Sequence, residues 1–70
     1  MTFHEWIQTR RPTWSARGDA VRTLQFWIED GLLPEIESAE QLTDYAKSQG
    51  TGEIAIWAMG RLFEEWKRTT

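Results

Sequence analysis

The stretch that decides the fold is Gly52 to Arg68, GEIAIWAMGRLFEEWKR. Four of its apolar residues follow one another at i, i+4 spacing: Ile54, Ala58, Leu62 and Trp66. A second row lies beside them: Ala55, Met59 and Phe63, with Ile56 at its edge. The resulting apolar arc covers roughly half of a helix, wider than the ~100° stripe of a usual surface helix. We therefore expect a central helix here, with the preceding helices packed around it.

The 70 residues form one domain, 1–70, near the size at which a single core is only just sufficient. No cysteine is present, so disulfides and thiolate metal sites cannot supplement the core. The chain instead carries five Trp, three Phe and one Tyr. Since a buried aromatic truncated to Ala costs about 3–5 kcal/mol, we expect most aromatics to be core residues.

Charge is unevenly distributed along the chain. Residues 1–28 hold four arginines against two acidic residues, a balance of +2, and residues 29–70 hold four basic against nine acidic residues, a balance of −5. The net charge of −3 argues against a dedicated nucleic-acid binder, whose usual footprint is a basic face. No signal peptide or membrane-spanning run is visible, so we expect a soluble, cytoplasmic protein with no membrane partner.

The first predicted helix covers about residues 3–10. Thr2 and Glu5 form a capping box at its start, and Pro12 ends it. Its expected inner face comprises Phe3, Trp6, Ile7 and Arg10. His4 is expected on the exposed flank.

A second helix is predicted from about Ser15 to Asp30, closed by Gly31 in the left-handed conformation. One face is apolar: Ala20, Val21, Leu24, Trp27 and Ile28. Phe26 falls on the opposite, polar side. Leu32 and Leu33 are expected to supply the apolar contact that follows the helix end.

A third helix is predicted over residues 39–49, with a capping box of Ser38 and Gln41 and a stop at Gly50. Its expected buried residues are Ala39, Leu42, Tyr45 and Ala46. The four predicted segments give an all-α fold, a compact four-helix bundle with the C-terminal helix central.

Five short motifs resemble the YozE/SAM-like family of small bacterial proteins. They are Phe3-His4-Glu5-Trp6-Ile7, Gly18-Asp19-Ala20, Leu33-Pro34, Ser38-Ala39-Glu40-Gln41-Leu42 through Tyr45, and Leu62-Phe63-Glu64-Glu65-Trp66. The resemblance spans nearly the whole chain and implies a domain similar to a sterile alpha motif. It implies no activity, since such folds serve both protein and nucleic-acid binding.

Candidate chemistry is sparse. His4 is the sole histidine, and no recognisable spacing of Asp or Glu joins it in a metal site. The adjacent Glu64 and Glu65 point about 100° apart on a helix and cannot share one site. No nucleophile with a relay and no phosphate-binding loop is present. We therefore predict a non-enzyme with no catalytic residues, no metal and no cofactor.

Two surface features remain. Phe26, Trp57 and Trp14 fall outside the apolar arcs, with Arg61 placed to stack on Trp57, and off-face aromatics commonly anchor protein interfaces. The alternative is that a loop or the N-terminal segment covers them. The second feature is a group of arginines around Trp14: Arg10, Arg11, Arg17 and Arg22. They could grip phosphates or an acidic protein, or simply pair with Glu5 and Asp19.

The leading interpretation is a small non-catalytic protein–protein interaction module, either a bacterial accessory protein or a phage-encoded inhibitor. Its anchors would be Trp14, Phe26, Trp57 and Arg61. The main alternative is nucleic-acid binding through the arginine group and Trp14. We expect a monomer or a weak homo-oligomer formed through the exposed aromatics.

Overall fold

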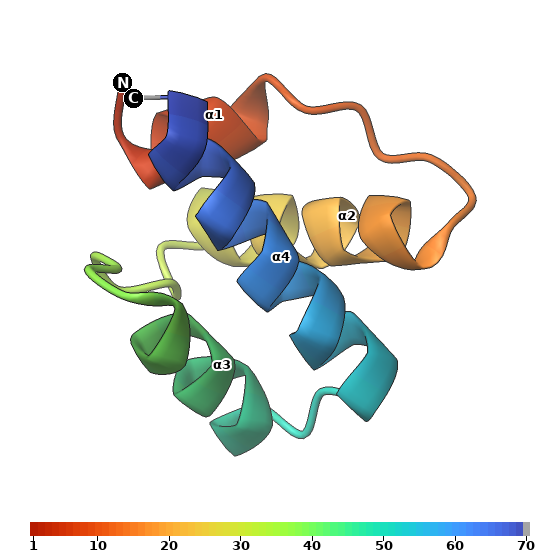
Figure 1. Ribbon diagram of the computed structural model, residues 1–70. Helices are drawn as coiled ribbons and strands as arrows, with labels where there is room; N and C mark the ends of the chain where they lie inside the picture. The colour runs from red at the N-terminus through yellow and green to blue at the C-terminus, as the bar shows by residue number, and fades with distance from the viewer. Residues whose placement is uncertain (70) are drawn as a thin grey trace.

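In the computed structural model, which describes residues 1–69, the chain folds into four helices: α1 (Phe3–Gln8), α2 (Ala16–Glu29), α3 (Ala39–Ser48) and α4 (Glu53–Thr69). The longest helix, α4, packs against each of the other three. It crosses the molecule diagonally between α2 and α3, and α1 lies near its C-terminal end (Figure 1). The all-α prediction and the central position of the C-terminal helix are confirmed.

The ends of α1 follow from local hydrogen bonds. The Glu5 amide donates to Thr2 Oγ1 at 3.1 Å, and the Thr2 amide donates to Glu5 Oε1 at 2.8 Å, which confirms the capping box. At the other end, the amides of Thr9 and Arg10 bond to carbonyls three residues back, a tightening typical of a final turn. The helix therefore ends at Gln8 rather than at residue 10. Arg10 lies beyond the end of α1, with its guanidinium carbon 4.8 Å from the centre of the Trp6 ring.

Two glycines end α2 and α3. Gly31 has φ 70° and Gly50 has φ 76°, the left-handed region that favours glycine. At the start of α3, Ser38 Oγ accepts from the Gln41 amide at 3.1 Å, as predicted. The predicted return bond is wrong, because Gln41 Oε1 accepts from the Glu37 amide at 2.8 Å instead. The Gln41 side chain therefore bonds to the segment that precedes α3 and not to the N-cap residue Ser38.

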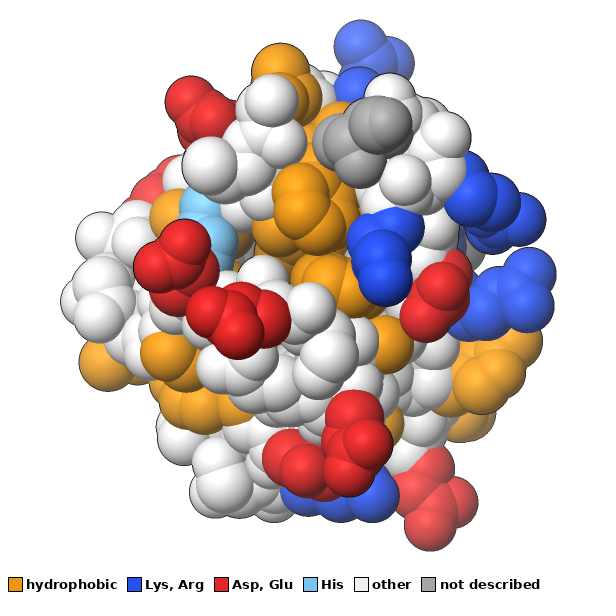
Figure 2. Space-filling view, turned by 60° about the vertical axis from the view of Figure 1, so that its left-hand side comes forward, with side chains coloured by type: hydrophobic (Ala, Val, Ile, Leu, Met, Phe, Trp, Pro, Cys, Tyr) orange, Lys and Arg blue, Asp and Glu red, His pale blue; other side chains and the backbone are white. Residues whose placement is uncertain are grey.

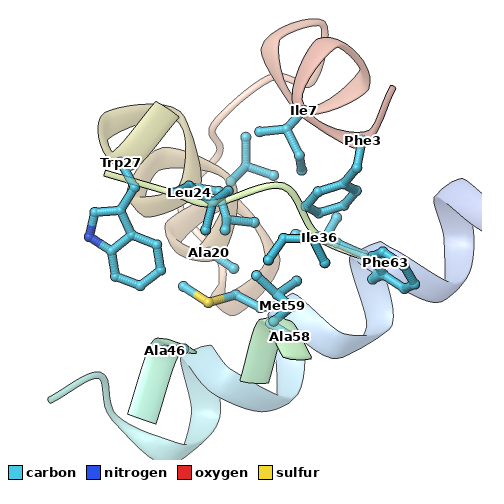
Figure 3. Close-up of a cluster of buried hydrophobic side chains, with 14 of the residues drawn as sticks. Phe3, Ile7, Ala20, Leu24, Trp27, Ile36, Ala46, Ala58, Met59 and Phe63 are labelled. Carbon is cyan, nitrogen blue, oxygen red and sulfur yellow. The ribbon is translucent and has the colours of Figure 1, made fainter. Parts of the chain in front are cut away.

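The core draws buried side chains from all four helices and from the segment between α2 and α3 (Figure 3). They are Phe3, Trp6, Ile7, Ala20, Val21, Leu24, Trp27, Leu33, Ile36, Leu42, Ala46, Ala58, Met59, Leu62 and Phe63. Six residues of the predicted apolar faces are only partly buried: Ile28, Ala39, Tyr45, Ala55, Ile56 and Trp66. Of the two leucines after α2, Leu33 is buried, whereas Leu32 is exposed.

Trp66 ties the end of α4 to the N-terminus. Its ring packs against Phe3 and Phe63, with ring centres 5.7 and 5.4 Å away, and its Nε1 donates to the Met1 carbonyl at 3.1 Å. An indole at the edge of a core keeps its polar atom near a hydrogen-bond partner in this way. The N-terminus and the end of α4 consequently lie side by side (Figure 1).

The prediction that Ile54 belongs to the buried row of α4 is wrong. Ile54 is 72% exposed, whereas Ala58 and Leu62 in the same row are buried. Residues four apart advance by about 40° beyond a full turn, so an i, i+4 row rotates slowly around the helix. Across four members this drift carries the first residue out of the packed face. Ile54 thus belongs to the surface.

Candidate functional site

Trp57 and Arg61 lie one turn apart on the outward side of α4. The Trp57 side chain is 64% exposed, and the guanidinium carbon of Arg61 lies 5.5 Å from the centre of its ring. Such a contact contributes about 0.5–1 kcal/mol at an exposed site. The predicted exposure and stacking are confirmed, and the alternative that a loop covers Trp57 is wrong. Its role in binding stays a prediction.

Ile54 extends this exposed face by one turn. Residues three apart on a helix are surface neighbours, so Ile54 and Trp57 present adjacent apolar side chains to solvent. Sequence reasoning missed Ile54 because it followed the i, i+4 row. The i, i+3 relation to Trp57 is the signal that would have placed it. We call Ile54, Trp57 and Arg61 the α4 face.

A hollow of about 240 Å³ adjoins the α4 face. It is lined by residues from the start of α2 and from successive turns of α4: Arg17, Trp57, Ala58, Arg61, Glu65 and Arg68. Three guanidinium groups therefore surround one carboxylate and one exposed indole. Arg68 was not among the predicted site residues, although it lies two turns beyond Arg61 on the same side of the helix.

Two of the residues that line this hollow, Arg17 and Glu65, form an ion pair. The guanidinium of Arg17 donates to both carboxylate oxygens of Glu65, with an Nη2–Oε1 distance of 3.0 Å. These hydrogen bonds, chiefly, lower the pKa of the Glu65 carboxyl below its ordinary value, and nearby arginines add to the effect. Both side chains are more than one-third exposed, so the pair is a surface ion pair. No sequence signal pointed to this pairing, because the two residues are far apart in the chain.

Trp14 is 95% exposed in the loop between α1 and α2. The guanidinium carbon of Arg22 lies 5.2 Å from the centre of its ring. The loop around Trp14 is held closely against α2. A Cβ at Gly18 would stand 2.0 Å from the Thr13 carbonyl oxygen, so glycine is required for this approach. The predicted exposure of Trp14 is confirmed.

Phe26 is also exposed, at 57%, and lies in the C-terminal half of α2 on its outward side. Arg22, one turn earlier, pairs with Asp19 at 2.7 Å. Phe26 does not line the hollow beside Trp57. The two predicted aromatic anchors therefore belong to different helices, and only Trp57 adjoins the hollow.

The four arginines predicted to form one group have different nearest partners, although Arg17 and Arg10 both lower the pKa of the Glu65 carboxyl. Arg17 bonds Glu65, Arg22 bonds Asp19, and Arg10 lies over the Trp6 ring with its guanidinium carbon 4.8 Å from the centre. Arg11 is exposed in the loop. Of the two predicted acidic partners, Asp19 is used, whereas Glu5 caps α1 instead.

A second hollow, of about 350 Å³, lies beside the N-terminus and is lined in part by His4, Glu35, Ile36 and Trp66. Figure 2 shows this face, with apolar side chains near its centre, several acidic ones on the left and at the bottom, and most of the basic ones on the right. The prediction of an exposed His4 is wrong. The side chain is half-buried, and its Nε2 lies 3.2 Å from the Leu33 carbonyl oxygen. His4 therefore links α1 to the segment after α2.

Among residues 1–69, no three His, Cys, Asp or Glu side chains gather in a way that could hold a metal ion. In the same range, no helix combines the length and apolar character needed to cross a membrane.

Comparison with known proteins returned no match: no family model, no curated protein and no solved structure corresponds to this chain. The resemblance to the YozE/SAM-like family stays a prediction.

Proposed function

We propose that this protein is a small, non-catalytic interaction module that binds another protein through the α4 face. The observation that carries the proposal is the exposure of Ile54 and Trp57 on adjacent turns, next to a hollow. A 70-residue chain with a tight apolar core has few large side chains to leave in water. Exposed aromatics next to arginine are typical of the residues that dominate binding energy at protein interfaces.

The side chains of the α4 face are held by a well-packed helix, and this rigidity supports the proposal. Trp57 and Ile54 project from the longest helix, which the other three helices hold in place. Side chains on a rigid helix lose less conformational freedom on binding than side chains on a loop, which favours affinity. Arg61 over the Trp57 ring limits the rotamers of both side chains before a partner arrives.

An affinity capture from the source organism tests the proposal. Immobilised wild type should retain a protein that Trp57→Ala loses, while the two proteins unfold at nearly the same temperature. Phe26→Ala is the matched control, because it removes an aromatic of similar exposure from another helix. Equal retention by wild type, Trp57→Ala and an Ile54→Ala variant would overturn the assignment of the α4 face.

The domain is further proposed to be similar to a sterile alpha motif and related to the YozE/SAM-like family, on the motifs quoted above. The four short helices and the central C-terminal helix support this proposal. An experimental structure that aligns poorly with sterile alpha motifs would contradict it.

Nucleic-acid binding through Arg10, Arg11, Arg17 and Arg22 is the alternative proposal. The Arg22 guanidinium over exposed Trp14 favours it, since bases stack on such side chains. The ion pairs of Arg17 and Arg22 with carboxylates weigh against it. Binding of single-stranded DNA that weakens steeply with salt would support it, and no binding at low salt would exclude it.

A further inference from the structure

The hollow beside the α4 face is basic, although it belongs to the acidic half of the chain. All but one of its lining residues come from α4, whose surrounding sequence, residues 29–70, has a balance of −5. Three arginines face a single carboxylate within the hollow. The α4 lining alone has two arginines and one carboxylate, and the tertiary packing that brings Arg17 to Glu65 raises this local surplus of positive charge from one to two.

Two of these arginines are available to a ligand. Glu65 is already engaged by both nitrogens of the Arg17 fork. Arg61 and Arg68 form no ion pair with any residue in the described range 1–69. Each guanidinium offers a planar set of donors that matches a carboxylate. Among the described lining residues, two guanidinium groups thus lie outside the Arg17–Glu65 ion pair, and of these Arg68 also acts on Glu65 electrostatically.

The apolar neighbours narrow the class of ligand. Trp57 lines the hollow and exposed Ile54 lies one turn before it on α4, so a fitting ligand carries an apolar group beside its negative charge. A nucleic-acid strand suits this site poorly. Its phosphates follow one another at short intervals, whereas the hollow holds one compact group of arginines. A few carboxylates beside an aliphatic side chain match the charge of the hollow and the exposed apolar side chains next to it.

We propose that the hollow receives acidic side chains of a partner protein segment, while an apolar residue of that segment packs on Trp57 and Ile54. This inference rests on the proposed function and adds the chemistry of the partner. Complementary charges of this kind also raise the rate of encounter, an effect that salt screens.

Titration of isotope-labelled protein with short synthetic peptides tests the proposal, with the indole N–H signal of Trp57 as the readout. Loss of one indole signal in Trp57→Phe assigns it. A peptide built from Glu and Leu should shift this signal, and added salt should weaken the binding. A peptide of the same length built from Gln and Leu, which keeps the apolar residues, should bind several-fold more weakly.

Charge variants locate the contact. Arg61→Gln and Arg68→Gln should each weaken binding of the Glu–Leu peptide about two- to five-fold, the range expected for single exposed ion pairs. Lys47→Gln is the matched control, because it removes one positive charge from α3, outside the hollow.

Three results would overturn the inference. If the two peptides bound equally and the arginine variants had no effect, the inference of an acidic partner would be wrong. The proposal that the α4 face is an apolar interaction surface would still stand. No binding of either peptide would also remove the acidic partner, while the affinity capture with Trp57→Ala would still decide the proposed function. Preferential binding of an oligothymidylate at the Trp57 signal would overturn both proposals.

Discussion

The guanidinium of Arg17, in the first turn of α2, donates hydrogen bonds to the carboxylate of Glu65, near the C-terminal end of α4. This ion pair joins two helices at the rim of the basic hollow. It also positions a cation beside the hollow that the sequence of α4 alone does not supply.

The Arg17–Glu65 pair makes stability depend on pH. Because folding lowers the pKa of Glu65, the pair contributes stability above the ordinary pKa of a glutamate, and the contribution is lost as pH falls through the lowered value. We expect Glu65→Gln to lower the melting temperature slightly at neutral pH, with a deficit that shrinks as the solution becomes acidic.

A double-mutant cycle with Arg17→Gln isolates this effect. The coupling at neutral pH should be about 0.2–1 kcal/mol, as for exposed pairs. The Glu65→Gln substitution should not lower stability further in the Arg17→Gln background. If it did, or if the loss of stability grew as the pH fell, the ion pair would not be the source of the effect.

Gly18 is required for the loop that carries Trp14. A Cβ there would stand 2.0 Å from the Thr13 carbonyl oxygen, so Gly18→Ala must displace the loop or α2. Overpacking of this kind costs about 1–3 kcal/mol, which for a small domain lowers the melting temperature by roughly 4–8 °C per kcal/mol. Gly52→Ala is the control, since a Cβ there meets no atom within 4 Å. Equal melting of the two variants would show that the loop does not pack as described.

Ile54 and Ile7 provide a matched test of which isoleucines are core residues. Ile7 is fully buried, so Ile7→Ala should cost about 2–5 kcal/mol. Ile54 is exposed, so Ile54→Ala should change the free energy of unfolding by less than about 0.5 kcal/mol. Chemical denaturation of both variants measures these values. A large loss of unfolding free energy in Ile54→Ala would show that Ile54 is a core residue and does not belong to the α4 face.

Trp57 and Trp27 provide the same comparison for tryptophan. Trp27 is buried and its ring centre lies 5.3 Å from that of Tyr45, so Trp27→Ala should cost about 3–5 kcal/mol. Trp57→Ala removes little more than the contact with Arg61, so it should lower the free energy of unfolding by less than about 1 kcal/mol. Comparable losses in the two variants would contradict the surface position of Trp57.

Local sequence determined the helices and most of their ends. The Thr2–Glu5 box, the Ser38 cap and the glycines at 31 and 50 act through bonds between residues a few positions apart, so their outcome does not depend on the rest of the fold. The helical period likewise placed Trp57 and Phe26 outside the apolar arcs.

Only the tertiary structure decided which groups meet. Ile54 lies outside the packed face because the other helices cover only part of the apolar row on α4, and Ile36 is buried because the segment after α2 folds back on the core. The Arg17–Glu65 pair and the His4 contact with Leu33 join residues distant in the chain. Their geometry depends on how whole helices pack, and no short stretch of sequence contains that information.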